Sequence, residues 1–150
     1  MFRDNLPIGQ FYEIGVDMKD PYTVCGGLQD NGVWCVPSAT SNRNGIANSD
    51  AWNIGSGDGF HAHIDPTDPN TVVLESQGGR ANRVSLLTLE RQQISPVGTD
   101  KPKPGEDTLR WNWDTPLVMS PHNASIINAR SPIATHVANA VVTCPPQDTR

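Results

Sequence analysis

The chain has 150 residues and a formal net charge of −5, with 13 glycines, 13 prolines and a hydrophobic share of 36%. This composition indicates a loop-rich β protein and disfavours helical bundles. No apolar run approaches the roughly 20 residues that a transmembrane helix needs, so we expect no membrane span. Nucleic acid is not expected as a partner, because its binding depends on Lys and Arg side chains that neutralise phosphates, and no basic stripe is present.

Alternating apolar and polar residues predict two sets of four strands. The first set is predicted at Phe11–Val16, Tyr22–Leu28, Val33–Val36 and Ala51–Ile54. Asp30-Asn31-Gly32 follows the second strand, and Asn-Gly is the dipeptide best suited to a primed hairpin turn. The second set is predicted at Phe60–Ile64, Thr71–Ser76, Asn82–Leu87 and Leu109–Trp113. Its first two strands are separated by prolines and aspartates, which stop a strand and turn the chain back.

The two sets are copies of one repeat with unchanged spacing. The matched pairs are Asp17 with Asp65, Pro21 with Pro69, and Gln29 with Gln77, and a weaker third copy begins at Leu117. A period of about 40 to 50 residues made only of strands is typical of a β-propeller blade, which needs neighbours to bury its faces. We therefore expect a partial β-propeller over residues 1–127, with four-stranded antiparallel blades at about 11–54 and 60–113 and a third from 117. The chain would then be a fragment. The alternative is a small β-sandwich whose internal similarity is accidental.

A tryptophan closes each copy just before the next one opens. Trp52 ends the first copy, and Trp111 and Trp113 end the second. An aromatic ring at this point would fill the space between adjacent sheets.

The three cysteines give no zinc-binding spacing. A turn centred on Asn31-Gly32 would place Cys35 opposite Leu28, too far from Cys25 for a disulfide without a bulge or slip. We therefore expect Cys25 and Cys35 to be separate buried thiols. The third cysteine is Cys144.

Asp58 is the candidate catalytic residue, and Asp30, His61 and Gln77 are the candidate binding residues. Asp58 stands between Gly57 and Gly59 at the entrance to a strand, where flanking glycines allow a tight backbone that presents the carboxylate. The alternative, which the sequence favours, is that Asp58 only caps a turn. Glycoside hydrolysis needs a second carboxylate beside Asp58, for which Asp30, Asp50 and Glu75 are available.

His61 and His63 alternate on one strand, so both side chains point to the same face. Such a pair can hold a metal if a third ligand is added, and His122 and Glu75 are the candidates. Packed, hydrogen-bonded histidines are the favoured interpretation, so neither a metal site nor a cofactor is predicted. No Gly-x-Ser-x-Gly, P-loop or dinucleotide fingerprint is present.

Three blocks together resemble a known family. They are Asn5 to Tyr12, Gly26 to Trp34, and Gly57 to Phe60 followed by Asp65-Pro-Thr-Asp-Pro. They are similar to bacterial propeller proteins with BNR/Asp-box repeats, described as glycosyl-hydrolase-like or sortilin (Vps10)-like. The resemblance implies a large, usually exported propeller, in which some members use carboxylates at the channel mouth and others only bind partners. Gln29 to Trp34 is an abbreviated likeness of the family's Asp-box.

Residues 128–150 depart from the family, because they contain no glycine and no aromatic residue where the resemblance predicts a strand and an Asp-box. We expect an irregular tail here, and our hypothesis is that the reading frame slips near Ile127. The alternative is a divergent or disordered end.

The leading functional hypothesis is a scaffold that recognises a protein or a glycan, with no catalysis by this chain alone. The alternative is a fragment of a glycoside hydrolase with channel-facing carboxylates, Asp58 among them. The chain is expected to need the remaining blades of its own propeller, and exposed sheet edges and faces predict self-association. The amino terminus lacks the layout of a signal peptide, so the compartment stays unknown, although the resemblance implies an exported parent protein.

Overall fold

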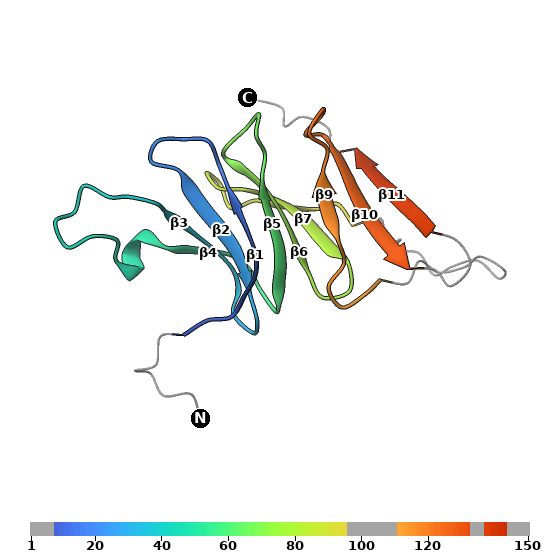
Figure 1. Ribbon diagram of the computed structural model, residues 1–150, viewed down its shortest axis with the longest axis horizontal. Helices are drawn as coiled ribbons and strands as arrows, with labels where there is room; N and C mark the ends of the chain where they lie inside the picture. The colour runs from blue at the N-terminus through green and yellow to red at the C-terminus, as the bar shows by residue number, and fades with distance from the viewer. Residues whose placement is uncertain (1–7, 96–110, 133–136, 144–150) are drawn as a thin grey trace.

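The computed structural model describes residues 8–95, 111–132 and 137–143, and in this part the chain forms β-strands and a single turn of 3-10 helix (Figure 1). The first sheet has the order β1 (Phe11–Val16), β2 (Thr23–Leu28), β3 (Gly32–Pro37), β4 (Trp52–Gly55), and the helix η1 (Asn48–Asp50) precedes β4. The second sheet has the order β5 (Gly59–Ile64), β6 (Thr71–Ser76), β7 (Arg80–Ser85), β8 (Arg91–Gln93). A third sheet has the order β11 (Val137–Thr143), β10 (Ile126–Pro132), β9 (Leu117–Met119). None of the described residues forms a helix long and apolar enough to cross a membrane.

The prediction of an all-β chain with two four-stranded antiparallel sheets is confirmed. The predicted strand Leu109–Trp113 is wrong, since the fourth strand of the second sheet is β8 and the described residues from Trp111 onward enter no strand before β9. The reason is a tight turn after β7. The amide of Leu89, at a positive φ of 60°, donates to the Ser85 carbonyl, so the chain returns at once and a polar segment pairs with β7.

The two four-stranded sheets share one register. Phe11 pairs with Leu28 in the first sheet, and Gly59 pairs with Ser76 in the second, each residue 48 positions after its counterpart (11 to 59 and 28 to 76). A register shift follows Phe11 and Gly59 alike. The paired residues of β6 and β7 likewise lie 48 positions after the paired residues of β2 and β3. Corresponding residues of the two sheets therefore occupy corresponding places in their strands.

The expectation of two free thiols is wrong, because Cys25 and Cys35 form a disulfide. Leu28 pairs with Gly32 across the β2–β3 turn, so the loop has three residues and Cys25 faces Cys35 directly. The predicted two-residue turn centred on Asn31-Gly32 would have shifted this register. The loop uses Gly32 at φ 74°, a conformation that glycine adopts without a steric penalty.

The first and second sheets pack face to face around an apolar core. The buried members of this core are Cys25, Val33, Cys35, Ile54, Ala62, Ile64, Val72, Leu74 and Val84, and Trp52 packs against them as predicted. Gly27 allows the close approach of β2 to β5, since a Cβ atom at this position would collide with the backbone of Gly59 and Phe60. The interface is therefore apolar and tightly packed.

The second and third sheets pack on a second core. Its buried members are Val73, Ala81, Ile94, Leu117, Ile127 and Ala129, with Trp111 and Met119 packed against them. Trp111 fills space between sheets as predicted, and its ring lies against Gly79. Trp113 does not, because its side chain is 62% exposed.

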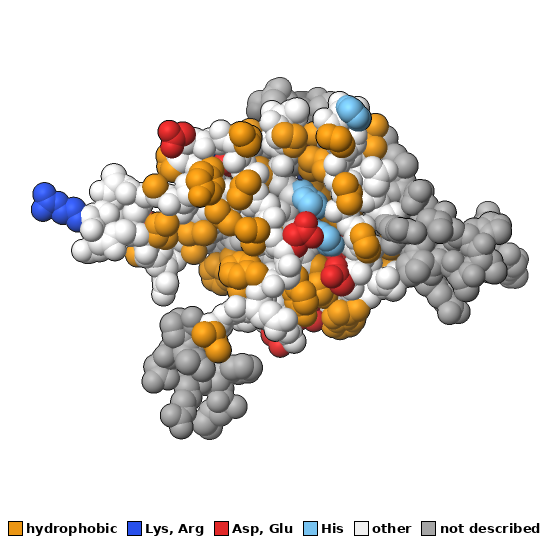
Figure 2. Space-filling model, viewed as in Figure 1, with side chains coloured by type: hydrophobic (Ala, Val, Ile, Leu, Met, Phe, Trp, Pro, Cys, Tyr) orange, Lys and Arg blue, Asp and Glu red, His pale blue; other side chains and the backbone are white. Residues whose placement is uncertain are grey.

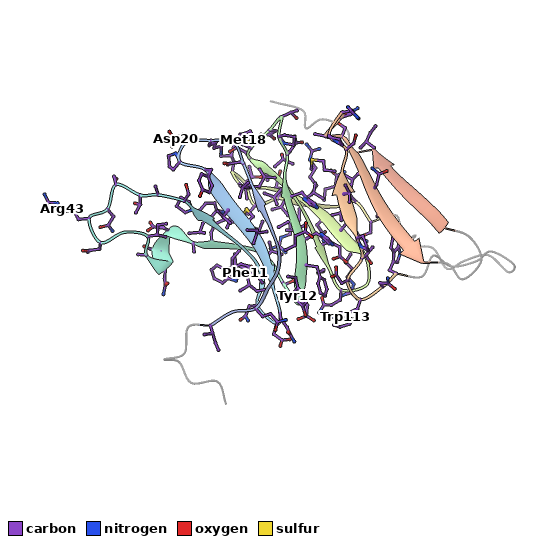
Figure 3. All side chains as sticks on the ribbon, viewed as in Figure 1. Phe11, Tyr12, Met18, Asp20, Arg43 and Trp113 are labelled. Carbon is purple, nitrogen blue, oxygen red and sulfur yellow. A yellow bond between two sulfur atoms is a disulfide. The ribbon has the colours of Figure 1, made fainter. Side chains whose placement is uncertain are left out.

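The sheets are stacked head to tail. The face of the second sheet that the first sheet covers carries Ala62, Ile64, Val72 and Leu74, whose counterparts 48 positions earlier are Ile14, Val16, Val24 and Gly26. On the first sheet this face is open, and Ile14 and Val16 are each more than half exposed. Figure 2 shows hydrophobic side chains gathered over this sheet, and Figure 3 shows Phe11 on it. A hollow of about 540 Å³ on this open face is lined by Ile8, Phe11, Leu28, Trp34 and Ile46, among others.

The third sheet extends into the segment that was expected to be an irregular tail. Residues 126–132 and 137–143 pair as an antiparallel hairpin, with Ile127 opposite Val142. Whether the reading frame slips near Ile127 stays a hypothesis, since pairing of strands does not test it. Cys144 lies outside the described residues.

Candidate functional site

Asp58 contacts Asp30 and Gln77, and all three residues were selected from the sequence. Asp58 is buried, and its Oδ1 accepts a hydrogen bond of 2.7 Å from the backbone amide of Asp30. The side-chain amide of Gln77 donates to Oδ2 at 3.3 Å. The neighbouring Gly57 carbonyl accepts a 2.8 Å bond from the Gly32 amide. These bonds fasten the β2–β3 turn to the start of β5, which is a turn-fixing role for Asp58, and its catalytic role stays a prediction.

Tyr12 stands beside this junction. It lies on β1, with its ring centroid 4.5 Å from that of Phe60, and its side chain is partly exposed (Figure 3). Burial raises the pKa of Tyr12 above its ordinary value, and the nearby charges of Asp58, Asp30 and Asp114 raise it further. Tyr12 is therefore an accessible aromatic hydroxyl within the field of three carboxylates.

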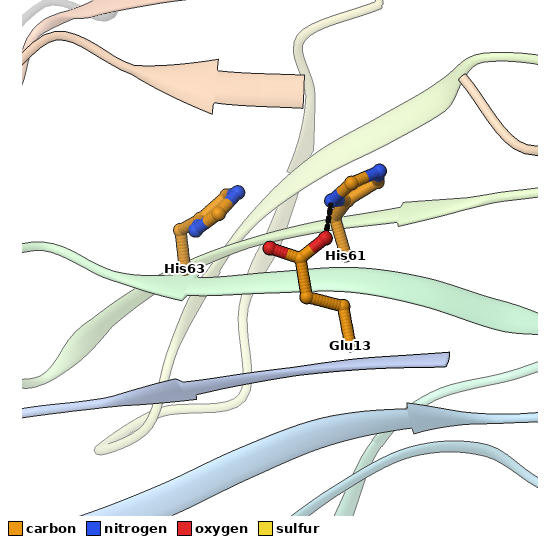
Figure 4. Close-up of side chains that lie close together, drawn as sticks. All are labelled: Glu13, His61 and His63. Carbon is orange, nitrogen blue, oxygen red and sulfur yellow. Dashed lines mark ion pairs between the residues drawn. The ribbon is translucent and has the colours of Figure 1, made fainter. Parts of the chain in front are cut away.

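His61 lies between two carboxylates. It is on β5 and mostly buried, with Nδ1 2.6 Å from Oε2 of Glu13 and Nε2 3.3 Å from Oδ1 of Asp114. Glu13 comes from β1, which lies beside β5 (Figure 4). Asp114 comes from the segment before β9. Three separate parts of the chain thus meet at one imidazole ring, and acidic and histidine side chains gather at this place on the surface (Figure 2).

His63 points to the same face as His61, as the alternation predicted. Its ring is stacked on the His61 ring with centroids 5.7 Å apart. Its Nε2 lies 2.7 Å from the Leu117 carbonyl oxygen of β9, which can accept a hydrogen bond from it. His63 therefore also ties the second sheet to the third, which agrees with the favoured interpretation of a packed, hydrogen-bonded histidine.

Glu75 is a fully buried carboxyl on β6. Its Oε1 accepts a hydrogen bond of 3.2 Å from the Gly79 amide, whereas Oε2 has no hydrogen-bond partner in the described part of the chain. Burial raises the pKa of Glu75 to about 8. The amides of Gly79 and Thr115 oppose this rise, and the charge of Asp114 adds to it. Half of this buried carboxyl group is therefore unsatisfied, which is unusual for a native interior.

Two groups of side chains bring metal-ligating atoms within 4.8 Å of one another among the described residues. One consists of Glu13, His61 and His63, and the other of His61, Glu75 and Asp114. His122, considered as a ligand from the sequence, belongs to neither group. Asp50 also lies elsewhere, since its Oδ2 accepts a bond from the Ala47 amide at the start of η1.

The sequence reasoning missed Glu13, Tyr12 and Asp114. The repeat carried a signal for Glu13, because Glu13 is the counterpart of His61 and the first strands of the two copies lie side by side. No comparable signal existed for Asp114, which depends on how the chain approaches β9.

Comparison with known proteins does not assign a family, because no family model, no curated protein and no solved structure matches the chain. The resemblance drawn from the sequence motifs therefore stays a prediction.

Proposed function

We propose that this chain is part of a β-propeller repeat protein and serves as a scaffold that recognises a protein or glycan ligand. The observation that carries the proposal is the convergence of accessible polar and aromatic groups on the first strands of the two repeats. Glu13 of β1, His61 of β5 and Asp114 before β9 meet at one surface, and Tyr12 of β1 lies within the electrostatic field of Asp114. Recognition sites typically combine a few convergent polar groups with aromatic side chains.

A glycan is the ligand class that this surface suits best. Carboxylates accept hydrogen bonds from hydroxyl groups, and Glu13 and Asp114 are both about half exposed. The Tyr12 ring offers an apolar face and a hydroxyl in one side chain. A sugar presents the complementary combination of hydroxyl groups and an apolar ring face.

The open face of the first sheet supports the propeller part of the proposal. Its apolar side chains are the counterparts of residues that are buried between the first and second sheets. A further sheet with the same small-residue face as the first would cover them, as a preceding blade does. The remaining blades are therefore the expected partners of this chain.

The test is a binding titration of the recombinant chain with β-glucan oligosaccharides and sialosides, followed by NMR of the aromatic and histidine signals. Ligand-dependent shifts at Tyr12 and His61 are expected, and Tyr12→Ala is expected to abolish them. Tyr22→Ala is the matched control, because Tyr22 is similarly exposed but lies at the other end of the β1–β2 hairpin. Equal loss in both variants, or shifts spread over the chain, would contradict the proposal.

The hydrolase alternative finds less support, because both carboxylate oxygens of Asp58 already accept hydrogen bonds. The same substrates assayed for hydrolysis with Asp58→Asn test it. Undiminished turnover in that variant would remove Asp58 from any mechanism.

A further inference from the structure

We propose that the chain binds a divalent transition metal ion, for which Zn²⁺ is the natural probe, through His61 Nε2 and the carboxylates of Glu75 and Asp114. One ligand atom from each of these residues lies within 4.8 Å of the others. Zinc bound to nitrogen and oxygen ligands at about 2.0 to 2.2 Å requires ligand atoms closer than this. Asp114 is about half exposed, so it can close the remaining gap.

The buried carboxyl of Glu75 is the second, independent observation. Its Oε2 has no hydrogen-bond partner in the described part of the chain, although the whole side chain is buried. A buried carboxyl oxygen without a partner is costly. A metal cation that displaces the carboxyl proton would give this oxygen a partner and balance the charge. Glu75 belongs to the same group as His61 and Asp114, so the side chain with the unpartnered oxygen and the other two ligands are in one place.

Glu13 gives His61 the orientation that a metal ligand needs. Its Oε2 lies 2.6 Å from Nδ1 (Figure 4), whereas Asp114 lies at the other ring nitrogen, Nε2. The contact lacks hydrogen-bond geometry, since Nδ1 has no hydrogen-bond partner in the described part of the chain. A rotation of the Glu13 carboxylate would let Nδ1–H donate to it and leave the lone pair on Nε2 facing Asp114. Metal-bound histidines commonly have a carboxylate on the other ring nitrogen, which fixes both the tautomer and the ring plane.

The ligand chemistry selects the class of metal. One imidazole nitrogen and two carboxylates suit Zn²⁺ and its neighbours in the transition series, whereas Ca²⁺ and Mg²⁺ prefer oxygen ligands alone. Three protein ligands leave a fourth position for water or a ligand atom. The exposed side of the site, at Asp114, is where that position is reached from solvent.

The experiment measures Zn²⁺ and Co²⁺ binding to the whole chain after chelator treatment, by calorimetry and by the visible absorption of bound Co²⁺. One ion per chain is expected. Glu75→Gln and Asp114→Asn are each expected to weaken binding by more than the 10 to 100-fold typical of losing a residue that only orients a ligand. Glu13→Gln is expected to weaken it by about 10 to 100-fold. His122→Gln, at an exposed histidine outside both groups, is the control and is expected to leave binding unchanged.

His63→Gln separates this site from the competing group of Glu13, His61 and His63. Binding that survives this change and is lost in Glu75→Gln supports the proposal. Binding lost in His63→Gln and retained in Glu75→Gln overturns it, as does the absence of any Zn²⁺ binding to the unmodified chain. Circular dichroism of each variant checks folding. Asp114→Asn keeps the test decisive if the buried Glu75→Gln variant does not fold, because Asp114 is exposed.

Discussion

The two interfaces between sheets use corresponding faces but differ in chemistry. Between the first and second sheets, β1 and β2 present Gly15, Cys25 and Gly27, and the buried layer is apolar. At the corresponding positions 48 residues later, the second sheet presents His63, Val73 and Glu75 to the third. The same strand arrangement thus forms either a tight apolar layer or an apolar layer that also contains polar side chains, and a few residues make the difference.

The difference shows where function can arise in a repeated fold. Small residues and a disulfide allow the backbones to approach closely, which leaves no room for a ligand. Histidine and glutamate hold the next pair of sheets through polar contacts and leave the unsatisfied oxygen of Glu75. We therefore expect variants of the first interface to change stability, and variants of the second to change binding.

Removing the disulfide is expected to have the largest effect on stability. Cys25→Ala with Cys35→Ala should lower the free energy of unfolding by about 2–4 kcal/mol, because the unfolded chain regains the freedom that the cross-link removes. Urea unfolding of oxidised protein measures this loss. Reductant should destabilise the unmodified chain and leave the double variant unaffected. Equal sensitivity of both proteins to reductant would show that the bond does not contribute.

Glycine substitutions test how tightly the first interface packs. Gly27→Ala places a methyl group against the backbone of Gly59 and Phe60, and we expect a loss of about 1–3 kcal/mol, as for overpacked cores. Gly26→Ala, at the preceding residue, is the matched control. The three atoms nearest to its methyl group belong to the side chains of Phe11 and Ile14 on the open face, which can move. The midpoint of thermal unfolding should be clearly lower for Gly27→Ala than for Gly26→Ala. Equal midpoints would argue against a tight interface.

Charges on the open face of the first sheet are expected to change association more than stability. Phe11→Glu with Ile14→Lys should convert self-associating protein to monomer in sedimentation velocity, because it interrupts an exposed apolar patch. Leu87→Lys alters a similarly exposed apolar residue on the β7–β8 turn and should leave association unchanged. An unmodified chain that sediments as a monomer would contradict the prediction.

The smallest effect is expected at Asp17, in the β1–β2 turn. Burial alone would raise the pKa of Asp17. Hydrogen bonds from Thr23 and Lys19, together with the Lys19 charge, outweigh burial and lower this pKa below its ordinary value of 3.8. A carboxyl with a lowered pKa in the folded state stabilises the fold above its ordinary pKa and loses that effect as the pH falls through the folded value. Asp17→Asn should therefore be less stable than the unmodified chain at pH 7, and the gap should narrow at pH 3 in urea unfolding.

The sequence predicted most of what depends on local pattern. Alternation located β1 and β6 with the bounds that the structure has, and Asp65 bonds the amide of Thr67 two residues on, as expected for this turn. Strand β8 was missed because its Arg-Gln-Gln segment lacks apolar alternation. The disulfide was missed because a turn one residue longer changes every pair in a hairpin.

Less of the candidate site could be predicted, because it depends on contacts between distant segments. Asp58, Asp30 and Gln77 were each selected from the sequence, but the sequence did not show that they are in contact. His61 was selected, yet its two carboxylate neighbours come from β1 and from the approach to β9. The residue pattern along one strand predicts the face of the sheet to which a side chain points. The contacts of that side chain depend on how the sheets pack together.

The head-to-tail packing of the sheets has a geometric consequence. Each sheet offers one face to the sheet before it and the opposite face to the sheet after it, so a further sheet that packs in the same way would again leave one face uncovered. Packing of this kind does not by itself limit the number of sheets. It ends only if the rotation from one unit to the next brings the last back to the first, or if a terminal unit carries a polar exterior.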